Sequence, residues 1–254
     1  MGNKNWNYAY NKYLCEKELS KKDINYTIIR PYVTYGKTRI PFPIIQNAQF
    51  TLLERIREEK PVVVFEDGQA ICTLTSTKDF AEVLYRLLLN PKAYKEDFYI
   101  TSHFRQTWMD VYLELCKILD KTPRAISASI EEIERFFPEY KSILLGDKGT
   151  NMLFNSSKVM NAIGNSYTFK TDLQKGLKES VDYYLNNRSM QSIDYKFDGE
   201  CDYFIFKKTG KKYSMISEGY PVDRKMNYYI MTNQLTNWSV NMLRKIRTMK
   251  NLGV

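Results

Sequence analysis

The chain has 254 residues, of which 43% are hydrophobic and 26% are charged. These proportions are typical of a globular protein with one large domain or two small ones. No apolar run approaches the roughly 20 residues that a membrane span needs, and the N-terminus lacks the basic and apolar regions of a signal peptide. We therefore expect a cytoplasmic protein without a membrane span.

The formal net charge is +9, which raises the question of a nucleic-acid partner. The lysines are spread along the whole chain rather than gathered in one segment, so we do not expect nucleic-acid binding. A basic protein also suits a small anionic substrate.

Cysteine and histidine usage argues against a metal site. Cys15, Cys72, Cys116 and Cys201 are far apart and form no C-x-x-C pair, and His103 is the single histidine. Without a cluster of such ligands we expect no zinc site, and free thiols in a reducing compartment.

The predicted elements alternate along the chain. The first half reads as a helix at 8–21, a buried strand at 24–31, a loop at 36–45, a helix at 46–59, strands at 61–65 and 71–74, and a helix at 79–89. The second half reads as strands at 97–101, 124–127 and 202–207, with helices at 105–119, 129–136 and 139–145. A capping box from Thr171 to Gln174 opens a further helix, and a last helix begins near 234. We interpret Asp79 as a helix-start residue and His103 as a loop residue.

Strands that alternate with helices indicate an α/β fold. Only two convincing β-rich runs, 24–31 and 61–65, precede residue 90. These are too few for a complete doubly wound sheet.

The first helix carries a tyrosine and a lysine four residues apart twice, as Tyr8 with Lys12 and as Tyr13 with Lys17. Residues at i and i+4 lie on one face of a helix, one turn apart. A phenol with a pKa of about 10 becomes a usable base when a nearby cation favours the phenolate. Such a tyrosine could take a proton from a substrate hydroxyl. On spacing alone a solvated helix face is the simpler interpretation, so both stay open until the context is considered.

The context continues the pattern of the first pair. An acidic residue follows Lys12 by four positions, the next strand ends in Arg-Pro, and a Tyr-Gly comes after it. These residues are Glu16, Arg30, Pro31, Tyr35 and Gly36. In this order they resemble the extended short-chain dehydrogenase/reductase superfamily, and most closely its NAD-dependent epimerase/dehydratase family. Lys12 leaves the usual helix length before Arg30, whereas Lys17 lies too close, so the resemblance selects Tyr8 and Lys12.

The resemblance extends over about residues 5–190. Residues 61–88 resemble the family's strand, acidic-Gly turn, second strand and Asp-led helix, and residues 154–185 resemble its later Ser-Lys helix, Gly turn and helix. It implies an α/β fold made of part of an NAD(P)-binding Rossmann-like domain and the small α/β substrate domain. We expect a Rossmann remnant in 1–35, the remaining Rossmann strand and helix mixed with the substrate domain in 36–190, and a C-terminal extension ending in a basic helix in 191–254.

The family's functional residues carry over to matching positions of this sequence. Tyr8 and Lys12 would be catalytic: Tyr8 would deprotonate a sugar hydroxyl, and Lys12 would hold the nicotinamide ribose and favour the phenolate. The residues that would contact the cofactor are Tyr8, Lys12, Pro31, Tyr32 and Val33. The candidates for substrate contact are Arg30, Lys37 and Arg39.

The family's Gly-rich turn has no counterpart in this sequence. The turn binds the NAD pyrophosphate at a helix N-terminus, and no G-x-x-G-x-x-G occurs here. The seven residues before Tyr8 also include no Ser or Thr to hold the substrate hydroxyl. The resemblance therefore covers the C-terminal portion of the family's fold. NAD or NADP, and a nucleotide-sugar substrate, are expected only if the missing half is supplied, with a separate Rossmann half or a homo-oligomer as the partner.

Two functions follow from this pattern. The first is an NAD-dependent epimerase/dehydratase-type oxidoreductase acting on a nucleotide sugar, truncated or split into halves. The second is a non-catalytic binding or assembly module derived from that family. Epimerase, dehydratase and reductase chemistry all stay open for the first.

Overall fold

The computed structural model describes residues 7–45, 48–216 and 226–232. The helices are α1 (Asn7–Ser20), α2 (Gln49–Arg57), α3 (Thr77–Leu87), α4 (Trp108–Ile118), α5 (Ile130–Phe136), α6 (Lys141–Ile143), α7 (Ser157–Ala162), α8 (Leu173–Asn186), α9 (Tyr195–Thr209) and α10 (Met226–Thr232). The strands are β1 (Thr27–Pro31), β2 (Val33–Tyr35), β3 (Val62–Phe65), β4 (Ile71–Cys72), β5 (Leu74–Ser76), β6 (Glu96–Ile100), β7 (Gln106–Thr107) and β8 (Ala125–Ala128). None of the helices within these ranges is both long and apolar enough to cross a membrane.

The strands form pairs, most of them parallel. β1 pairs with β6, β2 with β5 and β3 with β8 in parallel, and β4 pairs with β7 in antiparallel orientation. Parallel partners need a crossover connection, and helices such as α2 and α3 lie in these connections. The predicted α/β class is therefore confirmed.

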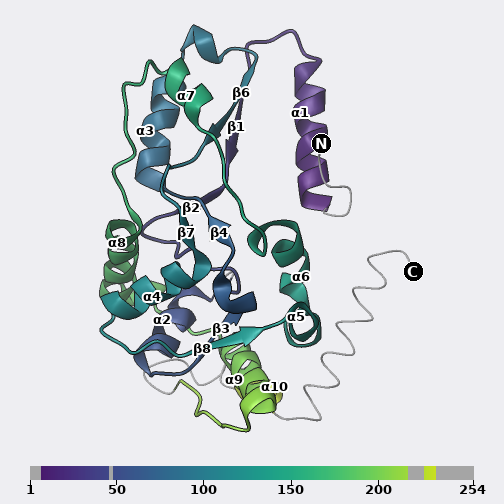
Figure 1. Cartoon of the computed structure of the whole chain (residues 1–254), viewed down its shortest axis with the longest axis vertical. Helices are drawn as coiled ribbons and strands as arrows, with labels where there is room; N and C mark the ends of the chain where they lie inside the picture. The colour runs from purple at the N-terminus through teal and green to yellow at the C-terminus, as the bar shows by residue number, and fades with distance from the viewer. Residues whose placement is uncertain (1–6, 46–47, 217–225, 233–254) are drawn as a thin grey trace, which may run out of the picture.

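The β1–β6 pair lies at one end of an elongated molecule, with α3 and α7 on one side of it and α1 on the other (Figure 1). Its core is built from α3, β6, α7 and the segment after α7, with Val83, Phe98, Ile100, Val159 and Phe169 among its buried side chains. We expected a buried strand at 24–31, but no side chain of β1 is fully buried. Within the described residues β1 pairs only with β6, so no strand is described beside its other edge.

The larger core occupies the rest of the molecule, around α2, β3, α4, α8 and α9. β3 is buried along its whole length because the run Val62–Phe65 is apolar and lies under these helices. In Figure 1, α9 and α10 lie at the end opposite α7. The C-terminal segment is thus part of this core as far as the structure describes it.

A cluster of four buried charges joins α9 to the strand–helix layer. The Arg55 guanidinium pairs with Asp198 and donates to Asp202 at 2.9 Å, and the Lys60 ammonium lies 2.8 Å from Asp198 and 2.7 Å from Asp202. All four side chains are at most 4% exposed. The Tyr228 hydroxyl also donates to Asp202, at 2.7 Å, so α10 is attached to the same cluster. Two cations and two carboxylates balance, which makes the burial of charge tolerable.

The strand predicted at 202–207 is wrong, because these residues belong to α9. The aromatic and β-branched run Tyr203–Phe206 favours a strand in isolation. Helix-start and helix-stop signals on either side of this run outweigh its preference for a strand. The Asp194 side chain accepts from the backbone N–H of Phe197, and Gly210 ends the helix with a φ of 73°.

The capping box predicted at Thr171 is displaced by one residue. Asp172 is the N-cap of α8, and its carboxylate accepts from the backbone N–H of Lys175 at 2.8 Å. Thr171 is instead buried, and its N–H donates to Asp79. The predicted helix near 234 lies outside the described residues.

Candidate active site

The Tyr8 and Lys12 side chains lie together on α1. The Lys12 ammonium is 5.7 Å from the centroid of the Tyr8 ring, as the spacing of four residues on a helix requires. Tyr8 is 61% exposed, so the face that carries the pair is open to a ligand or a partner. The second pair differs, because the Tyr13 ring lies against Tyr10 at 6.5 Å.

Arg30 fixes α1 to the β1–β6 pair. Its guanidinium donates twice to Glu16 on α1, at 2.9 and 2.6 Å, and once to Asp97 on β6, at 2.5 Å. The same group lies 5.4 Å from the Tyr99 ring. The Arg30 guanidinium is thus surrounded by two carboxylates and a ring. Its role in the motif is structural, because these contacts hold α1 against β1 and β6. Contact between Arg30 and substrate stays a prediction.

The segment predicted to contact the nicotinamide follows directly after β1. Pro31 ends the strand and is exposed at its carboxyl end, where ligands of open α/β sheets bind. Tyr32 is half-buried, with its ring 5.0 Å from Phe154. The Val33 side chain is buried in the larger core, so only its backbone can face a cofactor.

A buried polar group that the sequence does not reveal lies beside Tyr32. Burial, and then the nearby Asp147 carboxylate, raise the pKa of the Tyr32 phenol, whose hydroxyl is enclosed without a well-formed hydrogen bond. Burial likewise raises the pKa of Asp147 and lowers that of Lys148, whose carbonyl accepts from the Trp108 indole at 2.8 Å. These residues are distant in sequence from Tyr32, so no local motif could have shown the contact.

The Tyr-Gly motif has a structural explanation. The Tyr35 ring is buried against Gly176 of α8, where an added Cβ would lie 2.3 Å from it, and its hydroxyl donates to the carbonyl of Asp172 at 3.0 Å. A Cβ on Gly36 would lie 2.4 Å from the Thr77 hydroxyl. The motif therefore packs β2 against α8 and the start of α3.

Lys37 and Arg39 lie on the turn that follows β2. The turn closes through two backbone hydrogen bonds between Gly36 and Arg39, at 2.9 and 3.2 Å. Both cations are exposed and line a cavity of about 270 Å³ together with Lys78 and Glu179. That cavity includes neither Tyr8 nor Lys12. The structure thus joins the predicted residues into two separate groups.

The two residues interpreted as structural occupy such positions. Asp79 lies in the first turn of α3, buried, and accepts from the Tyr167 hydroxyl at 2.6 Å and from the N–H of Thr171 at 2.9 Å. His103 is exposed in a loop, with its ring 4.3 Å from Phe104. Within the described ranges, no three His, Cys, Asp or Glu side chains are arranged to hold a metal ion.

Comparison with known families identifies the N-terminal part of the chain. Residues 2–100, which carry the Tyr8–Lys12 pair, match the model of the NAD dependent epimerase/dehydratase family. The match covers less than half of the chain. Over these residues the resemblance predicted from the sequence is confirmed. A comparison with curated protein sequences finds no match.

Solved epimerases share the fold. An epimerase from Methanothermobacter thermautotrophicus is 14% identical with a TM-score of 0.59, and the likeness covers 72% of this chain and 51% of that one. UDP-glucuronic acid 4-epimerase from Bacillus cereus, in complex with NAD, is 19% identical with a TM-score of 0.53, covering 71% and 50%. UDP-glucose 4-epimerase from Thermotoga maritima, with UDP-glucose, is 22% identical with a TM-score of 0.53, covering 70% and 53%.

These likenesses establish the fold and its extent. The epimerase structures support the predicted partial Rossmann-like class, and this chain spans about half the length of each of them. The residues predicted to lie at the nicotinamide are on α1 and directly after β1. The Gly-rich turn for the pyrophosphate does not occur in the sequence.

Proposed function

We propose that this chain supplies the acid–base part of an NAD-dependent epimerase/dehydratase that acts on a nucleotide sugar. The observation that supports it most is the position of Tyr8 and Lys12. They lie side by side on an exposed face of α1. Arg30 fixes that helix to β1, the strand that leads directly into the residues predicted to contact the nicotinamide.

Tyr8 would act as the general base. The Lys12 ammonium lies 5.7 Å from the centroid of the Tyr8 ring, on the same face of the helix. The phenolate takes the proton of a sugar hydroxyl and later returns it, as reversible oxidation of that carbon requires. Bound NAD supplies the hydride acceptor. The three N–H donors of Lys12 would also hold the ribose hydroxyls.

The remaining contacts are assigned from position. Pro31, Tyr32 and the backbone of Val33 would border the nicotinamide, since they follow the carboxyl end of β1. Lys37 and Arg39, and less directly Arg30, are the cations available for a diphosphate. The UDP-sugar named for one epimerase structure carries such a diphosphate.

The dinucleotide-binding half must come from residues outside this sequence. The edge of β1 away from β6 is suited to receive it, because an open parallel edge presents unpaired backbone groups. A separate Rossmann polypeptide, or a second copy of a longer product, would meet this requirement. We place the protein in the cytoplasm, where its four free cysteines stay reduced.

The alternative is a non-catalytic binding or assembly module. It is favoured by the large exposure of Tyr8 and by the lack of a Gly-rich turn in this sequence. Under this alternative the α1 face contacts a partner protein, and the Tyr8 hydroxyl has no role in turnover.

The test is reconstitution with a polypeptide that carries a Gly-rich NAD-binding half of this family. The readouts are NAD binding by calorimetry and conversion of UDP-sugars. Tyr8→Phe should lower turnover at least about 100-fold while NAD binding persists, because only the proton-transfer step is lost. Tyr13→Phe, from the second Tyr/Lys pair, is the matched control and should keep wild-type turnover. Equal activity of Tyr8→Phe and wild type would remove the catalytic assignment and favour the module.

A further inference from the structure

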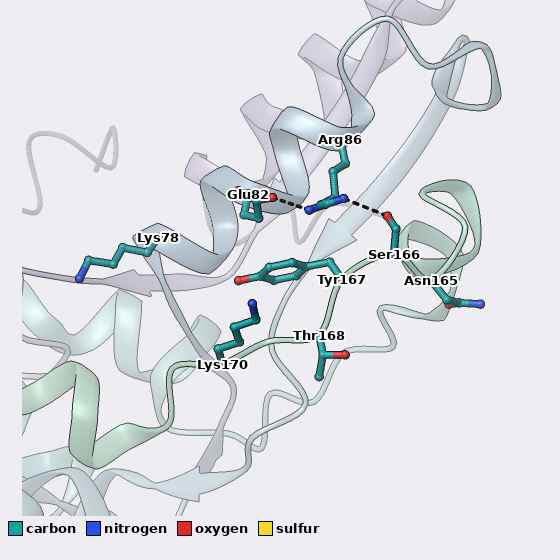
Figure 2. A pocket seen from close by; sticks show the side chains of 8 residues that line it. All are labelled: Lys78, Glu82, Arg86, Asn165, Ser166, Tyr167, Thr168 and Lys170. Carbon is teal, nitrogen blue, oxygen red and sulfur yellow. Dashed lines mark hydrogen bonds and ion pairs between the residues drawn. The ribbon is translucent and has the colours of Figure 1, made fainter.

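A second cavity, of about 600 Å³, opens between α3 and the segment 165–170. Figure 2 shows the side chains that line it. They are Lys78, Glu82, Arg86, Asn165, Ser166, Tyr167, Thr168 and Lys170. None of the residues assigned above to NAD or to the sugar is among them, although Lys78 also lines the cavity beside Lys37 and Arg39.

Tyr167 lies at the centre of this cavity with a cation on each side. The Arg86 guanidinium and the Lys170 ammonium are each 5.5 Å from the ring centroid, and Figure 2 shows them on opposite sides of the ring. The Tyr167 hydroxyl is fixed by its bond to the buried Asp79 carboxylate. Burial, and then this bond, raise the pKa of Tyr167 to about 12, so the ring stays neutral at physiological pH.

The three cations around Tyr167 differ in their partners. Of the cations that line the cavity, Arg86 pairs with Glu82 at 2.6 Å and Lys78 pairs with Glu179 at 2.7 Å. The Lys170 ammonium has no carboxylate partner among the described residues. The nearby Asp79 carboxylate is negative, but it accepts from the Tyr167 hydroxyl and from two backbone N–H groups and forms no ion pair with the Lys170 ammonium.

The Arg86 side chain keeps unused donors. One terminal nitrogen donates to Glu82, and the other donates to the Ser166 hydroxyl at 3.2 Å, as the dashed lines in Figure 2 show. A guanidinium has five N–H donors, so several remain without an acceptor among the described residues. The Ser166 hydroxyl in turn donates to the carbonyl of Ile163, at 2.7 Å.

Neither cation covers the edge of the Tyr167 ring, which also has Phe169 6.2 Å away between ring centroids. Both faces of the Tyr167 ring are occupied by cations, and the edge of an aromatic ring carries partial positive charge. A ligand at this edge meets a positive ring rim between two cations. Such surroundings favour an anion with several acceptor oxygens over a neutral or cationic ligand.

We propose that this cavity is a binding site for a small phosphate-type dianion, held between Lys170 and Arg86 at the edge of Tyr167. Lysine binds phosphate as a point charge, and arginine binds it through a planar set of N–H donors. The two together therefore suit a tetrahedral dianion. Lys78 contributes positive charge at the rim. The proposal does not depend on the NAD reaction, because it uses no residue of that site.

The test is calorimetric titration of the full chain with inorganic phosphate at constant ionic strength, with sodium chloride as the exchanged salt. Wild type should show saturable binding. Lys170→Gln should weaken it about tenfold or more, since a charge-assisted contact is lost. Lys22→Gln removes an exposed lysine on the turn after α1 and is the charge-matched control, which should bind like wild type. Lys78→Gln, at the rim, should weaken binding less than Lys170→Gln, and provides a second variant if the first is unstable.

Two results would overturn the proposal. One is phosphate heat no larger than that of chloride at equal ionic strength. The other is equal weakening by Lys170→Gln and Lys22→Gln, which would mean that net charge alone attracts the ion. A parallel titration with methyl phosphate separates two sources of the same chemistry: equal affinity indicates the terminal phosphate of a larger molecule, and binding of inorganic phosphate alone indicates the free ion. Neither titration contains NAD or sugar, so failure of the proposed enzyme function leaves this result unaffected.

Discussion

The two ends of the molecule differ in how far their ion pairs are exposed to solvent. At the end that carries Tyr8, the ion pair between Arg30 and Glu16 is about 30% exposed on both sides. At the other end, Arg55 and Asp198 are almost completely buried. Exposed pairs contribute little to stability, whereas a buried pair cannot lose one partner without a large penalty. The candidate chemistry thus lies at the end with the partly exposed ion pair, and we expect the buried pair at the other end to matter more for stability.

The strongest way to break this comparison is to remove one carboxylate at each end. Asp198→Asn should lower the free energy of unfolding by about 3–5 kcal/mol, because Arg55 and Lys60 then share a single buried carboxylate. Asp97→Asn, which weakens the Arg30 pair, should cost less than about 1 kcal/mol. Urea unfolding of both variants measures the difference. Equal losses would mean that the two ends are coupled as one stability unit.

The junction between the ends can be tested at Gly176. Gly176→Ala should cost about 1–3 kcal/mol, because the new methyl group meets the Tyr35 ring and forces β2 away from α8. This loss exceeds the gain of about 1 kcal/mol that alanine brings to a helix. Lys175→Ala, at the exposed neighbouring position, is the control and should be close to neutral. Thermal unfolding reports both, and a neutral Gly176→Ala would contradict the tight packing.

A smaller effect should appear in the pH dependence of stability. Burial raises the pKa of Cys72 to about 12, well above that of an unfolded thiol near 8.5. The folded state then holds this proton more tightly, so its contribution is complete below about pH 8.5 and is lost as pH rises towards 12. Between pH 9 and 10 the loss from this thiol is about 1 kcal/mol.

Cys72→Ala should therefore flatten the decline of the free energy of unfolding above pH 9. Cys15→Ala, at the exposed position on α1, should leave the slope as in wild type. Urea unfolding at a series of pH values gives the two slopes. If the two variants had identical slopes, burial of Cys72 in the larger core would not be what protects its proton.

Local patterns predicted the parts of this structure that depend on local interactions. The apolar run of β3 and the spacing of Tyr8 and Lys12 need only neighbouring residues, and the family match covers the segment that contains both. α9 was missed because the aromatic run Tyr203–Phe206 outweighed the Asp194 cap and the Gly210 stop. Both signals were present in the sequence.

Contacts between distant segments could not be predicted in the same way. The Arg30–Asp97 pair depends on the register of β1 against β6, which places Arg30 opposite Tyr99. The neighbourhood of Tyr32 and Asp147 depends on how the segment after α6 packs. The alternation of polar and apolar residues carries no information on such pairings, because they are decided by how the layers meet.

The buried charge cluster also sets an order of events during synthesis. Arg55 and its partner Asp198 are separated by 143 residues, whereas Arg30 and Asp97 are separated by 67. A chain leaving the ribosome can therefore pair β1 with β6 long before the larger core can close. During that interval Arg55 and Lys60 stay hydrated, and the apolar helices around them lack their last layer. A pause in translation before α9 emerges would prolong this state, which is when chaperones would have their longest access to the chain.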